Sequence, residues 1–509
     1  MEGLKMDVEF SRRSFIGGLT ALAASAKTIP CARAAGLGVP RLRFGVLSDT
    51  HIAIREEVEK YLLGDEKRFR PRSTELLEKA FRRFDKKGAD AVAIAGDITD
   101  WGTMGQFRAV VDCWNRVFPN GRSTIDGREV VFVPVLGNHD VAFRAWDKKA
   151  VNYITRALGP AKFPDEEVFK NDIAGNWQRI FGEPYEPVLY RKVKGYTFLG
   201  GHWHIDHYSD MAVPDLPDTL KRLDSELRGN KPFFYIQHPQ PLGTCLDAIG
   251  APDDGTSTRA LSSYPNAVVF SGHSHLSLTD ERNIWQGAFT SIGASSLDSL
   301  ECEQGRENGT RAGHWNHRYA MLPQMGRNYE TEETSAAHGM FVTVYDGFME
   351  IENHEFVHDC PLGPAVVVSL PAGKDSRYSD GGAKASSAPP APFPECATVE
   401  FSRLKGKWRL VFPAAVLVNG TPEPHDYEVT AFHLEDGAER RLFRRYVLRE
   451  KFFHSAAFRS KKVTADFRAE LFPNEGKVRF EIRPRDVFGR LGEALKADLP
   501  TNKVQPSTC

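Results

Sequence analysis

Five short polar clusters within the first 280 residues carry side chains that bind metal ions and transfer protons. Together they offer two carboxylates, one amide and four imidazoles as candidate metal ligands: Asp49, His51, Asp97, Asn138, His238, His273 and His275. A mixed set of nitrogen and oxygen donors suits borderline divalent ions such as Mn, Fe or Zn. Calcium prefers oxygen ligands alone. The residue types therefore predict a transition-metal or zinc site.

Glycine residues stand directly before Asp97, Asn138 and His273. Because glycine has no Cβ, it allows tight backbone turns that aim the next side chain outward. A single Asp-x-His motif is weak evidence for a site. The weight comes from all five clusters, each of which follows a short apolar run.

Those apolar runs predict the strands that position the clusters, at residues 42–47, 91–94, 130–136, 196–199, 232–236 and 267–270. Apolar residues at helical spacing predict a helix over 73–87 that ends at Gly88, and a second helix over 216–227. Alternating strands and helices indicate a layered α/β domain. In such folds ligands gather at the carboxyl ends of strands, so the clusters are expected to converge.

The series D-x-H, G-D-x-x-D, G-N-H-D, H and G-H-x-H resembles the calcineurin-like metallophosphoesterase family over about residues 41–280. The resemblance implies a four-layer αββα sandwich and two divalent metal ions. It also implies hydrolysis of phosphate mono- or diesters, as in a phosphatase or phosphodiesterase, by a hydroxide that bridges the ions. Its ligand sets are Asp49, His51 and His275 for one ion, and Asn138, His238 and His273 for the other, with Asp97 between them.

The same resemblance gives roles to the remaining polar residues of these motifs. His139 would stay off the metals and act as general acid toward the leaving group. Asp140 would orient the His139 imidazole, and Asp100 would support its loop. The expected catalytic residues are therefore His139 and Asp140.

The N-terminus, residues 1–35, predicts an export signal. Arg12 and Arg13 precede Ser-Phe-Ile, an apolar run of small residues follows, and Ala32-Arg33-Ala34 resembles a cleavage site. The paired arginines resemble a twin-arginine signal, which implies a periplasmic or extracellular protein. Elsewhere no run approaches the roughly 20 apolar residues of a transmembrane helix, so we expect no membrane span in the mature chain.

Three further segments are predicted: a phosphoesterase domain at 41–370, a linker at 371–396 and a C-terminal domain at 397–500. The linker is rich in Pro, Ser, Ala and Gly. The C-terminal segment has strand patterns at 408–412, 427–432, 461–467 and 477–482, which predict a β-sandwich. Its end, residues 480–489, is similar to a fibronectin type III domain, and residues 474–476 predict a hairpin turn.

The composition limits the expected partners. With 66 basic and 67 acidic residues, the net charge of −1 gives no electrostatic reason to expect a nucleic-acid partner. The seven cysteines include no C-x-x-C pair, which argues against a zinc ribbon. The expected partner is a phosphate-ester substrate, and the sequence does not indicate an oligomeric state.

Several alternatives stay open at this stage. The chain could be a non-catalytic exported binding protein whose C-terminal sandwich recognises a surface polymer. His202, His204 and His207 could line the substrate pocket or lie on an exposed loop. The polar stretch from 276 to 338 could be a lid over the site or a surface excursion.

Overall fold

The computed structural model describes residues 38–54, 56–57, 73–141, 165–204, 213–246, 252–302, 306–307, 336–373, 376, 378–379, 389–417 and 423–500. The predicted export signal at 1–35 lies outside these residues. The chain divides into two compact units, Met1–Pro40 and Arg41–Cys509, and the elements below belong to the second. Among the described residues, no helix has the length and apolar character needed to cross a membrane.

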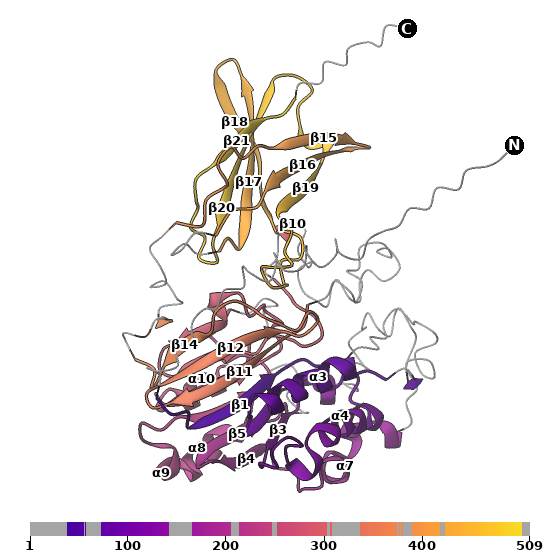
Figure 1. The fold of residues 1–509 in the computed structure, drawn as a ribbon, viewed down its shortest axis with the longest axis vertical. Helices are drawn as coiled ribbons and strands as arrows, with labels where there is room; N and C mark the ends of the chain where they lie inside the picture. The colour runs from indigo at the N-terminus through magenta and orange to yellow at the C-terminus, as the bar shows by residue number, and fades with distance from the viewer. Residues whose placement is uncertain are drawn as a thin grey trace, which may run out of the picture. The chain divides into compact units, whose positions relative to one another are not determined.

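A seven-stranded sheet carries the first three metal-ligand motifs. Its order is β13-β12-β11-β1-β2-β3, with β14 beside β12 (Figure 1). Strands β1, β2 and β3 are parallel, whereas β11 runs antiparallel to β1. The bounds are β1 Leu42–Leu47, β2 Ala91–Ala95, β3 Val131–Val135, β11 His338–Tyr345, β12 Phe348–Glu355, β13 Cys360–Pro361 and β14 Val366–Ser369.

A six-stranded sheet carries the last two motifs. Its order is β4-β5-β6-β7-β9-β8, and β5, β6, β7 and β9 are parallel. The bounds are β4 Val188–Val193, β5 Tyr196–Gly201, β6 Phe233–Gln237, β7 Ala267–Ser271, β8 Ile284–Gln286 and β9 Thr290–Gly293. All six strands predicted in this part of the sequence are therefore present, with small shifts at their ends.

The two sheets share a hydrophobic core. Phe44 of β1 contacts Phe198, Phe234 and Phe270 of the second sheet, with ring centroids 5.2, 4.8 and 5.7 Å apart. Phe84 of helix α3 is buried in the same core, against the face of Gly45. A face-to-face contact of this kind fixes the sheets against each other, so that their strand ends can form one site.

The helices are α3 Ser73–Lys86, α4 Met104–Val117, α5 Asn138–Val141, α7 Ile173–Phe181, α8 Leu216–Arg222, α9 Asp224–Leu227 and α10 Thr256–Leu261. Of the two predicted helices, the one over 73–87 is present as α3, and α4, α5, α7 and α10 were not predicted. Short 3-10 turns span Pro119–Gly121, Asp165–Glu167, Phe169–Asp172, Glu281–Asn283 and Ala469–Leu471. The expected helix over 216–227 is two helices, α8 and α9, which meet at Leu223.

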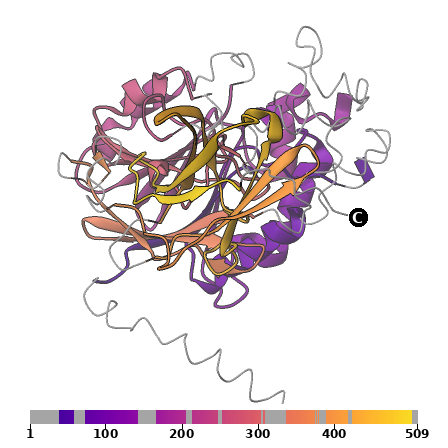
Figure 2. The ribbon, with the colours of Figure 1, turned by 90° about the horizontal axis from the view of Figure 1, so that it is seen from above.

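The C-terminal segment is built of β-strands in two sheets, drawn orange to yellow in Figure 2. One sheet has the order β15-β16-β19 and the other β10-β18-β17-β20-β21, in which the two-residue strand β10 comes from outside the C-terminal segment and pairs with β18. The bounds are β10 Arg306–Glu307, β15 Glu400–Leu404, β16 Lys407–Pro413, β17 Asp426–Glu435, β18 Ala438–Val447, β19 Lys462–Arg468, β20 Lys477–Arg485 and β21 Leu495–Asp498. Buried and exposed positions alternate along β20, as expected for a strand with one face in a core.

Two details of this segment differ from the expectations. The predicted hairpin turn at 474–476 is wrong, because β19 pairs with β16 whereas β20 pairs with β17. The turn residues therefore join strands of two different sheets. Within the predicted linker, Tyr378 is buried in the core of the two α/β sheets and Ala391 in the core of the C-terminal sheets.

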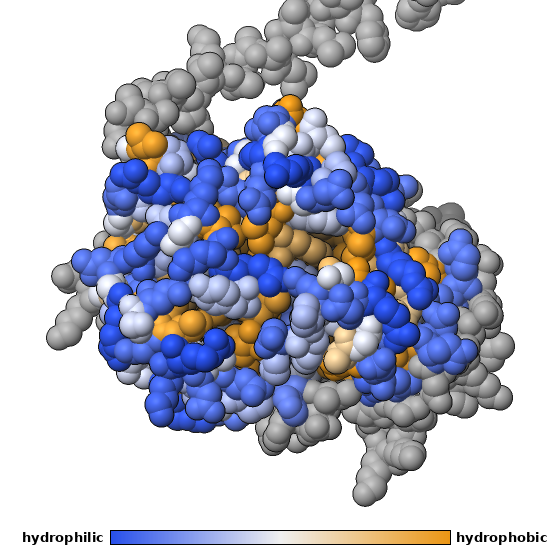
Figure 3. Space-filling model, turned by 90° about the horizontal axis from the view of Figure 1, so that it is seen from below, coloured by the Kyte–Doolittle hydropathy of each residue, from blue (hydrophilic) through white to orange (hydrophobic). Residues whose placement is uncertain are grey.

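The face of the molecule seen in Figure 3 is mostly hydrophilic. Its hydrophobic side chains lie mainly in recesses between hydrophilic ones. This view gives no reason to look for a functional site on a broad apolar patch of that face. The buried polar residues at the strand ends are the stronger candidate.

Candidate metal centre

The predicted ligands converge at the carboxyl ends of the parallel strands. Asp49 and His51 follow β1, Asp97 follows β2, and Asn138 begins the short helix α5 after β3. His238 follows β6, and the pair His273 and His275 follows β7. All seven side chains are buried. Residues more than 200 positions apart therefore form one cluster, as the motif order predicted.

Asp49, His51 and His275 form one half of the cluster. His275 Nε2 lies 2.9 Å from Asp49 Oδ1 and 3.4 Å from His51 Nε2. His51 Nε2 lies 3.8 Å from Asp49 Oδ1. Ligand atoms that share an ion at about 2.0–2.2 Å lie roughly 3–4 Å from one another. These three side chains therefore have the spacing of a metal site.

Asp97, His238 and His273 form the other half. His238 Nε2 lies 3.1 Å from Asp97 Oδ2, and His273 Nδ1 lies 3.2 Å from His238 Nε2. Asn138 Oδ1 is buried and accepts no hydrogen bond from any described residue. A buried amide oxygen without a donor is costly unless an ion or water meets it. The donor set thus fits a second divalent ion beside the first.

Hydrogen bonds on the outer side of the imidazoles fix which nitrogen faces inward. His238 Nδ1 donates to the carbonyl of Ala95 at 2.8 Å, and His275 Nδ1 donates to the carbonyl of Ser299 at 2.7 Å. Their Nε2 atoms are therefore unprotonated in the neutral ring and turn toward the carboxylates. This is the usual support of a metal-binding histidine.

The backbone at the ligands is conformationally unusual. Five of the seven have positive φ: Asp49 at 49°, His51 at 41°, Asp97 at 47°, His273 at 65° and His275 at 52°. Residues other than glycine rarely adopt this region, at a cost of about 1–3 kcal/mol each. Strain concentrated in one cluster indicates that the fold holds these side chains for a function.

The electrostatics of the cluster keep the carboxylates ionised. Burial acts to raise the pKa of Asp49, but the positive charges of His275 and His238 outweigh it and lower the pKa to about 2. Burial is also the largest influence on the pKa of Asp97, which His238 and His139 nevertheless hold well below its usual range. Ionised carboxylates are the form that binds a cation.

The surroundings shift the pKa values of His238 and His273 in opposite directions. Burial acts to lower the pKa of His238, but Asp97 and Asp49 raise it to about 9. Burial and the nearby charge of His238 lower the pKa of His273 to about 3. The two carboxylates therefore favour positive charge at His238 Nε2, beside the position that a divalent ion would take.

His139 lies at the centre of the cluster, with its ring fixed from behind. Its Nδ1 donates to the carbonyl of Asp100 at 2.9 Å, while its Nε2 lies 3.9 Å from Asp97 Oδ2. Burial lowers the pKa of His139. His139 also lies within metal-binding range of His51 and Asp97, so geometry alone allows it to be a ligand as well as an acid.

Asp140 does not orient the His139 imidazole as we expected. Its carboxylate accepts hydrogen bonds from the Thr99 hydroxyl at 2.7 Å and from the backbone N–H groups of Thr99, Gly137 and Ile98 at 2.8, 2.8 and 3.1 Å. Burial and the charge of Asp97 raise its pKa to about 7. Asp140 therefore ties the loops after β2 and β3 together, and the contact that orients His139 comes from Asp100.

The segment after β9 supports the site in a way that the sequence did not reveal. The Ser296 hydroxyl donates to the carbonyl of Asp49 at 3.1 Å, and Leu297 N donates to the carbonyl of Ser48 at 3.0 Å. Part of the predicted lid or surface excursion is thus a buried backing for the first ligand loop. Both contacts end on backbone carbonyls, which every residue has, so the residue types at these positions do not reveal them.

The histidines after β5 separate into different environments. His202 is buried, accepts a hydrogen bond from Leu136 N at 3.0 Å and stacks on Tyr185. Burial, with a smaller contribution from Arg191, lowers the pKa of His202 to about 3. His204 is half-buried, and His207 lies outside the described residues. His202 is therefore a structural support for the β3 loop rather than an exposed pocket residue.

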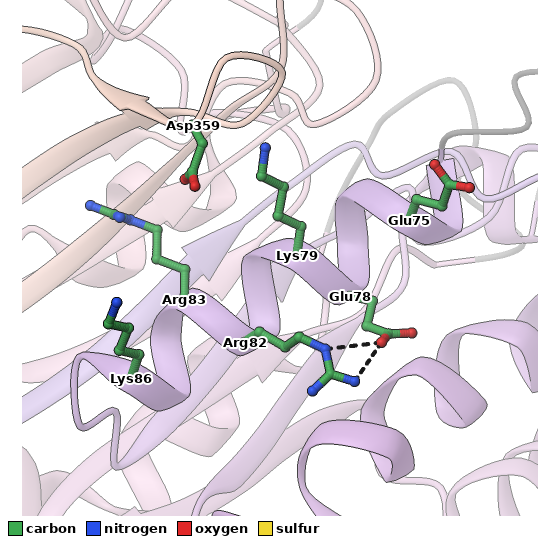
Figure 4. Close-up of a pocket in the computed structure, with 7 residues that line it drawn as sticks. All are labelled: Glu75, Glu78, Lys79, Arg82, Arg83, Lys86 and Asp359. Atoms are coloured by element: carbon green, nitrogen blue, oxygen red, sulfur yellow. Dashed lines mark hydrogen bonds and ion pairs between the residues drawn. The ribbon is translucent and has the colours of Figure 1, made fainter. Parts of the chain in front are cut away.

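A separate surface groove runs along α3 and contains none of the predicted ligands (Figure 4). It is lined by Glu75, Glu78, Lys79, Arg82, Arg83, Lys86 and Asp359. Arg82 donates to Glu78 across one turn of the helix at 2.6 Å. These exposed ion pairs are typical of a solvated helix face.

Comparison with known proteins agrees with the geometry. Residues 42–277 match the Metallophos family, described as calcineurin-like phosphoesterase. That range contains every predicted ligand and His139. No curated protein matches the sequence of the chain.

Several solved structures are similar over about two thirds of the chain. GAP50, the anchor in the inner membrane complex of Plasmodium, is 10% identical, with a TM-score of 0.35 over 67% of this chain and 92% of that one. A dimetal phosphatase from Danio rerio is 13% identical, with a TM-score of 0.32 over 65% and 99%. Zinc-bound Vps29 from Entamoeba histolytica is 10% identical, with a TM-score of 0.25 over 64% and 99%.

Proposed function

We propose, from the premise that residues 42–277 form a calcineurin-like phosphoesterase domain, that this chain hydrolyses phosphate mono- or diesters with two divalent ions. The observation that carries the proposal is the meeting of seven ligands from five strand ends around a buried centre. The four-layer αββα arrangement implied by the resemblance belongs to the same proposal.

The proposal assigns the ligands to the ions by the motif order. Asp49, His51 and His275 would hold one ion, and Asn138, His238 and His273 would hold the other, with Asp97 shared. Asp97 Oδ2 supports the shared role, since it lies 3.8 Å from His51 Nε2 in one half and 3.1 Å from His238 Nε2 in the other. The ions would be Mn, Fe or Zn, given the mixed donors.

The protein's own contribution is charge, position and a proton. Two bound divalent ions supply Lewis-acid charge and activate the attacking water. The Asp100 carbonyl fixes His139 by accepting from its Nδ1 and leaves Nε2 facing the site. The ring would act as general acid in its doubly protonated form, in which Nε2 carries the proton that the leaving alkoxide requires. General acid help of this kind is worth roughly 10²–10⁴-fold in rate.

A chromogenic phosphodiester and a chromogenic monoester, each assayed with Mn and after chelation, test the proposal. We expect turnover that disappears with chelation and returns with metal. Failure to turn over any phosphate ester while two ions are bound would favour the alternative, a non-catalytic binding protein that uses its C-terminal sandwich. The ratio of the phosphodiester rate to the monoester rate shows which class of ester the chain prefers.

Export is a separate proposal that rests on the N-terminal sequence alone. Arg12 and Arg13 would direct the folded chain to the twin-arginine route, which delivers it to the periplasm or beyond. Replacing both arginines with lysine should leave the protein in the cytoplasmic fraction of a bacterial host. Unchanged export of that variant would remove the proposal without affecting the enzymatic one.

A further inference from the structure

A second cluster of metal-ligating side chains lies outside the metal centre described above. Glu355 is the last residue of β12, His358 lies in the turn that follows, and His454 lies between β18 and β19. One ligand atom from each residue lies within 4.8 Å of the others. Glu355 and His454 are buried, and His358 is half-buried.

The three side chains point to one position. His358 Nδ1 lies 2.7 Å from Glu355 Oε2, and His454 Nδ1 lies 3.8 Å from the same oxygen. The two imidazole rings are 4.9 Å apart at 76°. Two nitrogens from separate segments thus face one buried carboxylate oxygen, as they would around a single ion.

Cys360 provides a fourth donor on the same side. It is the Cα partner of Glu355 across the antiparallel pair β12 and β13, so the two side chains leave the sheet on the same face. Its Sγ lies 4.0 Å from Glu355 Oε2. Tetrahedral zinc sites with bond lengths of about 2.0–2.3 Å have donors roughly 3.3–3.8 Å apart. Cys360 does not belong to the group of donors that all lie within 4.8 Å of one another, so its side chain would turn toward the two imidazoles to complete a tetrahedral set.

We propose that Glu355, His358, Cys360 and His454 bind one structural Zn²⁺. The chemistry favours zinc, since thiolate and imidazole are its common ligands and a carboxylate completes a tetrahedral set. Four protein donors leave no open position for a substrate, which is the mark of a structural rather than a catalytic site. The proposal rests on these four residues alone and is independent of the proposed function.

The surroundings hold the donors in place before any ion binds. Glu355 accepts from the backbone N–H groups of Val357 and His358 at 2.7 and 3.1 Å. The His358 ring stacks on Phe458, with centroids 4.0 Å apart. His338 Nε2 donates to the carbonyl of Phe453, next to His454, at 2.8 Å. Such outer contacts orient metal ligands and reduce the entropy lost on binding.

The site would join two parts of the chain that are distant in sequence. Three donors come from β12, β13 and their turn, and the fourth comes almost 100 residues later, between two strands of the C-terminal sheets. An ion that binds the folded chain but not the unfolded one stabilises the fold. Zinc here would therefore fasten the loop before β19 to the edge of the α/β sheet.

Counting metal in the purified full-length chain after dialysis into metal-free buffer tests the proposal. We expect His454→Gln and Glu355→Gln each to hold one equivalent of zinc fewer than the wild type, whatever number of ions the centre at the strand ends contributes to all three proteins. Asp359→Asn is the matched control, because Asp359 lies between two donors yet faces the groove along α3 (Figure 4). It should keep the wild-type count. Equal zinc counts in the wild type and His454→Gln would overturn the site.

Cobalt substitution provides a readout that does not depend on how well the variants fold. Cobalt-loaded wild type should show a thiolate-to-cobalt charge-transfer band, and Cys360→Ser should lose it while binding an equal amount of cobalt. A wild type without that band overturns the four-donor site. Hydrolysis of a phosphodiester with saturating Mn should be nearly unchanged in both Cys360→Ser and His454→Gln. A chain with three bound ions and no hydrolysis would instead refute the proposed function.

Discussion

The metal centre at the strand ends and the second cluster around Glu355 use similar side chains but differ in backbone conformation and in hydrogen bonding. At the metal centre, five ligand residues have positive φ, and Asn138 Oδ1 is buried without a described donor. At the second cluster, Glu355, His358, Cys360 and His454 all have negative φ. There Glu355 ends a regular strand and already accepts hydrogen bonds from its own turn.

This difference suggests how to distinguish a catalytic metal site from a structural one. A catalytic metal centre must keep charged groups close together without giving every ligand atom a hydrogen-bond partner in the protein. The fold holds that arrangement with strained backbone. A structural ion needs donors only at the right spacing, which ordinary strand pairing supplies. The predictions below test this distinction, beginning with the residue on which the metal centre depends most.

Asp97→Asn should give the largest loss. In the proposed centre Asp97 would be shared by the two ions, and its Oδ1 accepts from His139 N at 2.8 Å, so the change should weaken the binding of both ions and shift the acid. We expect phosphodiester turnover to fall by more than the roughly 10²–10⁴-fold that the loss of a general acid costs. Steady-state kinetics measure the turnover, and metal analysis of the purified variant measures the number of bound ions per chain. A variant that holds both ions and retains wild-type turnover would contradict the dinuclear centre.

His139→Ala should separate the acid from the ligands. If His139 acts as a proton donor, metal content stays at the wild-type value and turnover of a poor leaving group falls by roughly 10²–10⁴-fold. A good leaving group, which needs no proton, should lose far less. Loss of one metal equivalent would instead make His139 a ligand, as its distance from Asp97 permits.

Gly96→Ala should disturb the metal centre without removing any ligand side chain. Gly96 has φ of 85°, and an added Cβ would overlap the His238 ring. Displacing that ligand should weaken metal affinity by roughly 10–100-fold. Gly127→Ala is the matched control, since Gly127 has φ of 73° but open space around the added atom. Equal metal affinity in both variants would show that the close approach of Gly96 does not matter.

Most of the metal centre could be predicted from the sequence because its information is local. A polar motif after an apolar run identifies each strand end, with a glycine before the ligand at three of the five, as at Gly96 and Asp97. The parallel strands then bring the ends together. Buried strands such as Ala91–Ala95 are continuous apolar runs and leave little ambiguity.

The parts that could not be predicted depend on contacts between distant residues. The role expected for Asp140 belongs to Asp100, because backbone N–H groups decide where the Asp140 carboxylate turns. The turn before β20 looked like a hairpin, since Gly476 suits a turn whichever sheet the next strand joins. The cluster at Glu355 was invisible, because His454 becomes its neighbour only when the C-terminal strands are in place.

His202 provides the smallest expected effect and a third use of a buried histidine. Its folded pKa of about 3 lies below the usual value of 6.5, so the unfolded chain binds the extra proton between these values. Stability should therefore be complete above about pH 6.5 and fall as the pH is lowered through this window. Between pH 7.5 and 5 the wild type should lose about 2 kcal/mol from this group.

His202→Gln tests this effect, because glutamine can accept from Leu136 N but does not titrate. Denaturant unfolding followed by tryptophan fluorescence is suitable, since Trp177 lies 4.7 Å from the His202 ring. The variant should lose less stability than the wild type between pH 7.5 and 5. If the two lose equally, His202 is not the group whose protonation destabilises the fold.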